Sequence, residues 1–215
     1  AEDSAGETDS RMVGGVAWRY TPETWWQLEV AANRDSLRYS PLINDNGIVI
    51  DSLRVTATTR PADRWRANGT VDAWDVSDGN ARTGLLLEGW YLWPLEPIQL
   101  ETGYTFQWAD WDENLDNGYF DPQNFRAHLL RAQFTGPLPM QGGRWEAGVG
   151  FGVQSFEIGG VAVDNDNVLG LRGRVIVPLT DSLTLDVYAL WTDYAAGAAS
   201  GFESRQAGIR LRWQF

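Results

Sequence analysis

The segment Arg205-Gln-Ala-Gly-Ile-Arg-Leu-Arg-Trp-Gln-Phe215 at the end of the chain carries the strongest fold signal in the sequence. Apolar side chains occupy every second position, and polar residues or glycine occupy the positions between them. Because successive side chains of a strand point to opposite faces, this pattern predicts a β-strand with one apolar face and one polar face. The apolar face comprises Ala207, Ile209, Leu211, Trp213 and Phe215.

The same alternation recurs from Met12 onward, and no segment with helical periodicity interrupts it. We therefore predict an all-β protein built from about eleven or twelve strands. The predicted strands are 11–20, 24–40, 48–60, 64–76, 82–93, 97–109, 123–135, 144–157, 168–179, 182–194 and 204–215.

Composition narrows the class of protein. The chain has 215 residues, no cysteine and a formal net charge of −12, and its 17 basic residues are all arginine. The absence of cysteine excludes disulfides and thiolate metal ligands. The acidic balance opposes binding to nucleic acid. No apolar run approaches the ~20 residues of a transmembrane helix, so any membrane crossing must use strands.

Connections between the predicted strands alternate in length. Short turns fall at 21–23, 61–63, 94–97 and 180–181, with a longer turn at 136–143, whereas polar loops are expected at 77–81, 110–122, 158–167 and 195–203. Tryptophans on the apolar face gather near the short turns, as in the aromatic girdle of an outer-membrane barrel. They are Trp18, Trp26, Trp65, Trp93, Trp145 and Trp213.

The C-terminal strand resembles the last strand of bacterial outer-membrane β-barrels, which the barrel-assembly machinery reads through its terminal aromatic residue. The resemblance implies a transmembrane antiparallel up-and-down barrel in the outer membrane of a Gram-negative bacterium, in contact with lipid. Trp213 and Phe215 would form the assembly signal. We expect residues 1–10 to be an acidic N-terminal loop segment and residues 11–215 to form the barrel.

Strand number raises a question of parity. Eleven strands are predicted, whereas single-chain bacterial barrels have even numbers. Two alternatives remain open: the chain is the C-terminal part of a larger barrel of 12–16 strands, or it is a complete barrel of 10 or 12 strands.

A second resemblance lies after the longest predicted loop, where Gly118-Tyr-Phe-Asp-Pro-Gln-Asn-Phe125 opens a strand. Residues Gly118, Tyr119, Phe120, Pro122, Gln123 and Phe125 are similar to a motif in the barrels of tetratricopeptide-linked polysaccharide exporters, of the cellulose synthase operon protein C type. The resemblance implies a channel that exports a polysaccharide, contacts a glycan chain, and works with a periplasmic partner or a preceding part of the same protein. A plugged structural barrel that scaffolds a partner, and a general diffusion porin, remain alternatives.

Residues out of phase with the apolar face should line the interior of the barrel. The candidates are Arg19, Arg54, Arg66, Glu88, Glu101, Glu146, Arg172, Arg174, Asp186, Arg210 and Arg212. Two interpretations fit this set. The arginines guide anionic or hydroxyl-rich solutes by bidentate hydrogen bonds, or arginine–carboxylate ladders only hold the barrel wall together.

Aromatic and small residues share this predicted interior. Trp25, Trp74, Trp90 and Tyr188 point inward in the same phasing and suit either sugar rings or wall packing. Gly148, Gly150 and Gly152 follow one another on an inward face and leave space there.

Catalytic and cofactor chemistry is not expected. His128, the single histidine, lies in a strand whose phase is predicted to slip near Leu129-Leu130, and we interpret it as a wall residue. The acidic stretches 110–121 and 164–167 lack EF-hand spacing, so no metal site is predicted. The sequence predicts neither an enzyme nor a bound cofactor.

Overall fold

The computed structural model describes residues 13–36, 47–115, 119–140, 142–193 and 204–213. Within these ranges every regular element is a strand, and all eleven join one antiparallel sheet in chain order. The strands are β1 (Gly14–Glu23), β2 (Trp26–Ser36), β3 (Val49–Ala62), β4 (Trp65–Val76), β5 (Ala81–Pro94), β6 (Gln99–Trp111), β7 (Gln123–Pro137), β8 (Arg144–Ile158), β9 (Val161–Pro178), β10 (Leu183–Thr192) and β11 (Ser204–Trp213).

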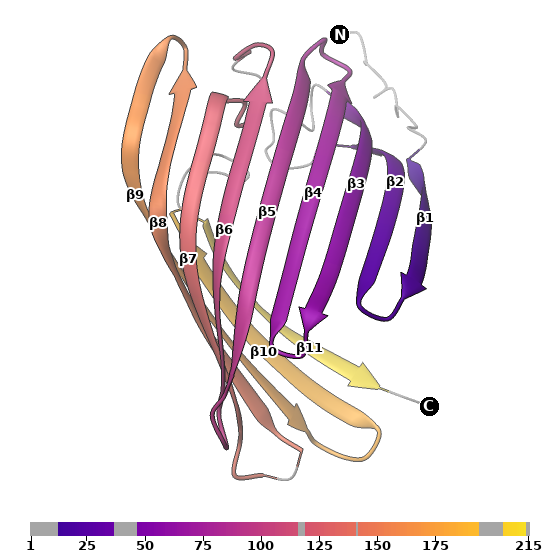
Figure 1. Cartoon of the computed structure of the whole chain (residues 1–215), viewed down its shortest axis with the longest axis vertical. Coiled ribbons are helices and arrows are strands. Elements are labelled where there is room, and N and C mark those ends of the chain that lie inside the picture. The colour runs from indigo at the N-terminus through magenta and orange to yellow at the C-terminus, as the bar shows by residue number, and fades with distance from the viewer. Residues whose placement is uncertain (1–12, 37–46, 116–118, 141, 194–203, 214–215) are drawn as a thin grey trace, which may run out of the picture.

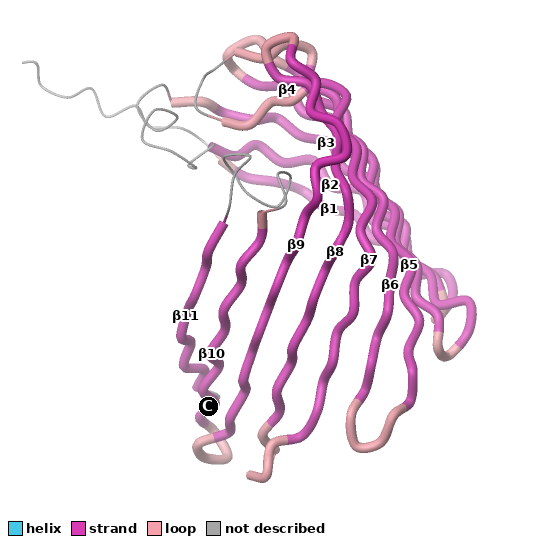
Figure 2. Tube along the Cα trace, turned by 90° about the vertical axis from the view of Figure 1, so that its left-hand side faces the viewer, coloured by secondary structure: helices cyan, strands magenta, loops and turns pink. Residues whose placement is uncertain are grey.

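The sheet curls around an open interior, with β10 and β11 passing behind β4–β7 in the view of Figure 1. The side view in Figure 2 shows the same curvature. Among the described residues β1 pairs only with β2, and β11 pairs only with β10. The prediction of an up-and-down antiparallel all-β fold is confirmed, and the described wall is open between β1 and β11.

The two edge strands have a geometric relationship that limits how the wall can close. Each strand of an antiparallel series reverses direction, so the first and the eleventh run the same way. Direct pairing of β1 with β11 would be parallel. An all-antiparallel barrel that contains this wall therefore needs an odd number of further strands between the two edges.

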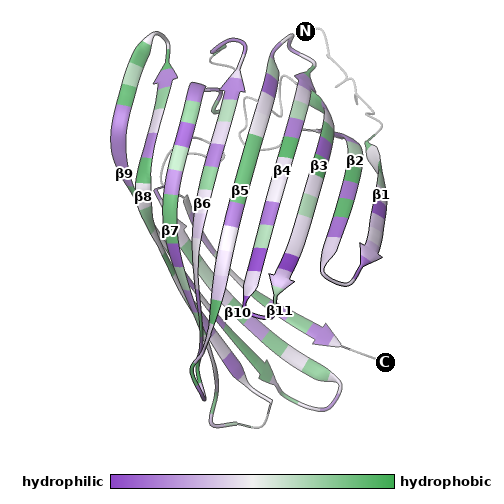
Figure 3. Ribbon diagram, viewed as in Figure 1, coloured by the Kyte–Doolittle hydropathy of each residue, from purple (hydrophilic) through white to green (hydrophobic). Residues whose placement is uncertain are grey.

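Hydropathy alternates along the strands, as the banding in Figure 3 shows, and the register places apolar side chains on the outer face and polar side chains on the inner face. On β11 the apolar side chains of Ile209, Leu211 and Trp213 are 75%, 62% and 68% exposed. On β7, Leu130 is 66% exposed, whereas its neighbour Leu129 points inward and is 4% exposed. The convex face is thus apolar and uncovered.

Aromatic rings contact one another on the outer face near the short turns. Trp18 stacks on Tyr20, which meets the edge of Trp26, and Tyr91 lies between Trp65 and Trp93. These contacts support the predicted girdle. Among the described residues no helix is long and apolar enough to cross a membrane.

The predicted loop 158–167 is wrong. β8 continues to Ile158 and β9 begins at Val161, so the two strands form one long hairpin. Gly159 and Gly160 have positive φ angles of 57° and 78°, which only glycine adopts readily and which suit a two-residue hairpin turn. The polar run Asp164-Asn-Asp-Asn167 just after the turn concealed this signal. The predictions for residues 1–10, Gly118, 195–203 and Phe215 lie outside the described residues.

The exposed outer face predicts a difference between two arginine substitutions on the same strand. Leu130→Arg places a charge on the apolar face and should destabilise the protein in lipid by about 2–4 kcal/mol if it lies near the bilayer midplane. Thr135→Arg places the charge on the inner face opposite Glu146 and should change stability little. Urea unfolding in lipid vesicles measures both. Equal effects would contradict the assignment of faces.

Candidate functional site

The candidate site is the concave inner wall, where polar side chains on neighbouring strands lie opposite one another. The register places Arg19 opposite Glu29, Arg54 opposite Asp72, and Asp186 opposite Arg210. Directly opposed residues are close enough for their side chains to interact across strands. Alternation and register together therefore build ladders of opposite charge.

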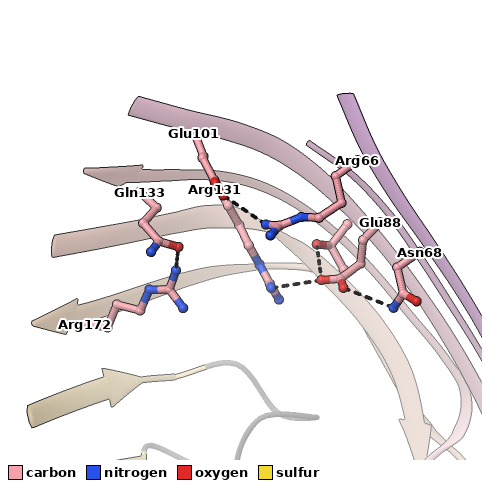
Figure 4. Close-up of polar contacts among 8 residues, drawn as sticks. Arg66, Asn68, Glu88, Glu101, Arg131, Gln133 and Arg172 are labelled. Atoms are coloured by element: carbon pink, nitrogen blue, oxygen red, sulfur yellow. Dashed lines mark hydrogen bonds and ion pairs between the residues drawn. The ribbon is translucent and has the colours of Figure 1, made fainter. Parts of the chain in front are cut away.

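The central part of the ladder crosses β4–β7 and is drawn in Figure 4. Arg66 Nη2 donates to Glu101 Oε2 at 2.9 Å. Arg131 Nη1 donates to Glu88 Oε1 at 3.3 Å, and Thr105 and Asn68 also donate to Glu88. Glu88 therefore receives donors from β4, β6 and β7, which fixes its position in the wall.

The C-terminal part of the ladder centres on Asp186. Arg174 binds this carboxylate through two parallel hydrogen bonds of 2.8 and 2.7 Å, a geometry that adds strength and direction. Arg212 lies 3.8 Å from Asp186, and Glu146 lies 3.8 Å from Arg174. Asp186 is nearly buried, whereas the side chain of Arg212 is half-exposed. Positive charge is in excess here.

Some inner arginines have no carboxylate partner among the described residues. Arg54 and Arg210 make no ion pair there, and Arg172 contacts only the amide oxygen of Gln133. Arg19 pairs with Glu29 at 2.7 Å on β1 and β2. All eleven predicted lumen residues thus occur on the inner face of the sheet. Their role in guiding a solute stays a prediction.

The sequence-based prediction missed three arginines of this wall, Arg82, Arg131 and Arg144, of which Arg144 lies 3.6 Å from Glu146. Arg82 pairs with Asp72 and lies over the Trp74 ring at 4.4 Å. Arg131 was lost because a phase slip was predicted near Leu129-Leu130. The strand instead keeps its phase from Ala127 to Gln133. The apolar residues Leu130, Ala132 and Phe134 at every second position were the available signal, because they place Arg131 on the opposite face.

His128 faces outward as a wall residue. Its Nδ1 lies 2.6 Å from the Tyr104 hydroxyl, and its ring packs against Phe106. Among the inward aromatics, Trp90 lies over Gly103 and under Arg66, and the Tyr188 ring lies over Gly208. Trp25 is a correction: it sits in the β1–β2 turn, half-exposed, with its ring against Trp26.

The motif that resembles polysaccharide exporters is packed inside the wall at the loop end. Tyr119, Pro122 and Phe125 are buried, and Phe120 packs against the cluster that contains Phe125. Gln123 donates to the carbonyl of Asp112. Tyr119 also contacts Trp111 in a second buried cluster. The described part of the motif therefore lies against the interior of the sheet.

Asn80, fully buried in the β4–β5 turn, holds this loop in place. Its Nδ2 donates to the Glu113 carbonyl at 2.9 Å and to the Tyr119 hydroxyl at 3.2 Å. Its Oδ1 accepts from the backbone N–H groups of Ala81 and Glu113. One side chain thus joins two loops that are far apart in sequence.

Asp121 is the acidic centre of the same network. It accepts hydrogen bonds from Leu115 N at 2.7 Å and Asn114 Nδ2 at 2.6 Å. Burial, and to a smaller extent the nearby Asp78 carboxylate, raise the pKa of Asp121, although the N–H donors act against this rise. Burial also raises the pKa of the Tyr119 hydroxyl, which donates to Asp78 at 2.8 Å.

The described ranges contain no metal-binding geometry. No group of three or more His, Asp or Glu side chains there could hold a metal ion. The acidic stretch 164–167 lies within β9. Its Asp166 accepts a hydrogen bond from Gln154 at 2.8 Å.

Comparisons with known proteins give a match in structure and none in sequence. Neither the family models nor the curated proteins contain a match. A solved structure described as a bacterial polysaccharide outer membrane secretin superposes with a TM-score of 0.74 at 16% sequence identity. The match covers 94% of this chain and 69% of that chain. At this identity the likeness establishes a shared fold.

The Asn80 network predicts a stability effect. Asn80→Ala removes the partner of the buried Tyr119 hydroxyl and of the backbone groups of Glu113 and Ala81, and should destabilise the protein by about 1–3 kcal/mol. Asn33→Ala removes an exposed amide from β2 and serves as the matched control. Urea unfolding of both variants in vesicles tests this. A wild-type midpoint for Asn80→Ala would show that the network contributes nothing to stability.

Proposed function

We propose that these strands form the wall of an outer-membrane channel that exports a polysaccharide. The observation that carries the proposal is the division of the sheet into an apolar convex face and a concave face of arginines, carboxylates and aromatic rings. A soluble monomer rarely exposes so large an apolar surface. The fold shared with a polysaccharide outer membrane secretin adds support.

Membrane insertion places a condition on the two free edges. Unpaired backbone N–H and C=O groups cost several kcal/mol each in hydrocarbon. The proposal therefore requires an odd number of further antiparallel strands to pair with β1 and β11, whichever polypeptide supplies them. The barrel-assembly machinery would insert such a barrel, and a periplasmic partner would deliver the glycan.

A narrow or plugged scaffold is the second candidate. One observation favours it: the loop that carries Tyr119 and Asp121 packs against the inner wall, where Trp111, Val76 and Ile48 form a buried cluster. Inward packing at the loop end narrows the interior. A general diffusion porin is the third candidate function, and the experiment must distinguish it from the other two.

Conductance in planar bilayers tests the proposal on the purified, membrane-extracted protein. An export channel should conduct, prefer anions, and be blocked by oligosaccharides but not by polyethylene glycol of equal size. Block by both polymers alike would indicate a general porin. A barrel that never conducts would support the scaffold instead.

The same recordings test the charge of the inner wall. Arg172→Ser/Arg174→Ser removes two positive charges from the inner face and should shift ion selectivity toward cations, because charge in a confined pore is poorly screened. Arg34→Ser/Arg126→Ser removes the same charge from the outer face and is the matched control. Unchanged selectivity in the inner-face variant would contradict a guiding role.

A further inference from the structure

The inner wall contains a recess of about 230 Å³ across β7–β10, separate from the packed loop end. Its floor follows from the register. Arg131 lies opposite Gly150, Gly150 opposite Gly170, and Gly170 opposite Thr192. With strands about 4.8 Å apart, this row spans roughly 14 Å. The two middle positions lack side chains, so the wall is hollowed between Arg131 and Thr192.

A second row beside the first brings another guanidinium group to the recess. Gln133 lies opposite Gly148, Gly148 opposite Arg172, and Arg172 opposite Leu190. The Arg172 side chain lies across Gly148, because a Cβ at that glycine would fall 2.6 Å from Arg172 Nε. Figure 4 shows Arg131 and Arg172 projecting into the interior from neighbouring parts of the wall.

The charges of these two arginines are only partly balanced. Arg131 shares Glu88 with Asn68 and Thr105 at distances of 3.3–3.5 Å, which are long for a charged pair. Arg172 contacts the neutral amide of Gln133 and no carboxylate among the described residues. Two guanidinium groups at one hollow therefore retain donors for an anion.

The remaining lining suits a sugar ring. Trp90 and Leu129 give the recess apolar surface, and the Thr192 side chain adds a hydroxyl group. A recess this size is smaller than the roughly 300–1,000 Å³ of sites for drug-sized ligands. It therefore fits a single sugar unit of a chain better than several units at once.

We propose that this recess binds the carboxylate of an acidic sugar unit, such as a uronic acid, within the exported glycan. The carboxylate lies between Arg131 and Arg172 and accepts their N–H donors, while the ring rests over Gly150 and Gly170. Planar carboxylates match the guanidinium fork in geometry. This proposal rests on the proposed export function in one respect, namely that the acidic sugar belongs to an exported glycan. Binding of the sugar in the recess does not itself require an open pore.

Titration calorimetry on the detergent-purified protein tests the recess. The probes are a hexamer of galacturonic acid and maltohexaose, a neutral chain of equal length. The acidic hexamer should bind at least about tenfold more tightly than maltohexaose, and its affinity should fall as salt screens the contact. Equal affinities for the two, or no binding of the acidic hexamer, would overturn the proposal.

Two variants separate charge from shape. Arg172→Gln should weaken binding of the acidic hexamer by about tenfold or more, since hydrogen bonds to a charged group are the stronger kind. Gly150→Ala/Gly170→Ala keeps every charge and fills the floor. A Cβ at either glycine meets no atom closer than 3.6 Å, so the fold should tolerate it. This variant should also bind at least about tenfold more weakly.

Matched controls leave the recess intact. Arg34→Gln removes an outer-face arginine on β2, and Gly173→Ala adds a methyl group in open space on the outer face of β9. Both should bind the acidic hexamer like wild type, and heat-modifiable gel migration checks that all variants fold. Wild-type affinity in both recess variants would refute the site. If the protein conducts but does not bind the acidic hexamer, the recess proposal is refuted and the channel proposal stands. If the protein binds the acidic hexamer but never conducts, the channel proposal is refuted and the recess proposal stands.

Discussion

Every strand of this sheet must satisfy its backbone hydrogen bonds through its neighbours while its side chains face two different surroundings. Antiparallel pairing in chain order satisfies the backbone hydrogen bonds everywhere except at the free edges of β1 and β11. Alternation of apolar and polar residues suits the two surroundings, because successive side chains of a strand point to the convex and the concave face in turn. The apolar surface, the inner charge ladders and the open edges all follow from this combination.

The inner ladders show how one wall combines rigidity with excess positive charge. Glu88 and Asp186 each receive donors from more than one strand and fix the wall locally. Arg172 and Arg210 lie in the same wall without a carboxylate that belongs to them alone. Paired residues thus hold the wall together, and on our proposal the unbalanced arginines bind a ligand. On this proposal the two interpretations of the inner arginines apply to different residues of one surface.

The sequence predicted what alternation encodes and missed what depends on distant contacts. The two-residue hydrophobic period predicted the number of strands, their approximate limits and, for most of them, which residues face outward, because an apolar residue at every second position marks the outer face. It failed at Gly159-Gly160, where the polar run 164–167 led us to interpret a tight turn and the start of β9 as one loop. It failed at Arg131, where two adjacent leucines suggested a slip that does not occur. Asn80 could not be found at all, since its partners Glu113 and Tyr119 lie more than 30 positions away and only folding brings them together.

A cysteine scan along β7 tests the central claim of two faces in two environments most directly. The chain has no native cysteine, so each single substitution from Ala127 to Thr135 gives an unambiguous signal. In vesicles, odd-numbered positions should react with a membrane-impermeant maleimide, less readily at buried Ala127 and Leu129. Labels at even-numbered positions should be quenched by lipid-borne spin probes. The absence of that two-residue period, or equal reaction at both sets of positions, would contradict a wall with lipid outside and water inside.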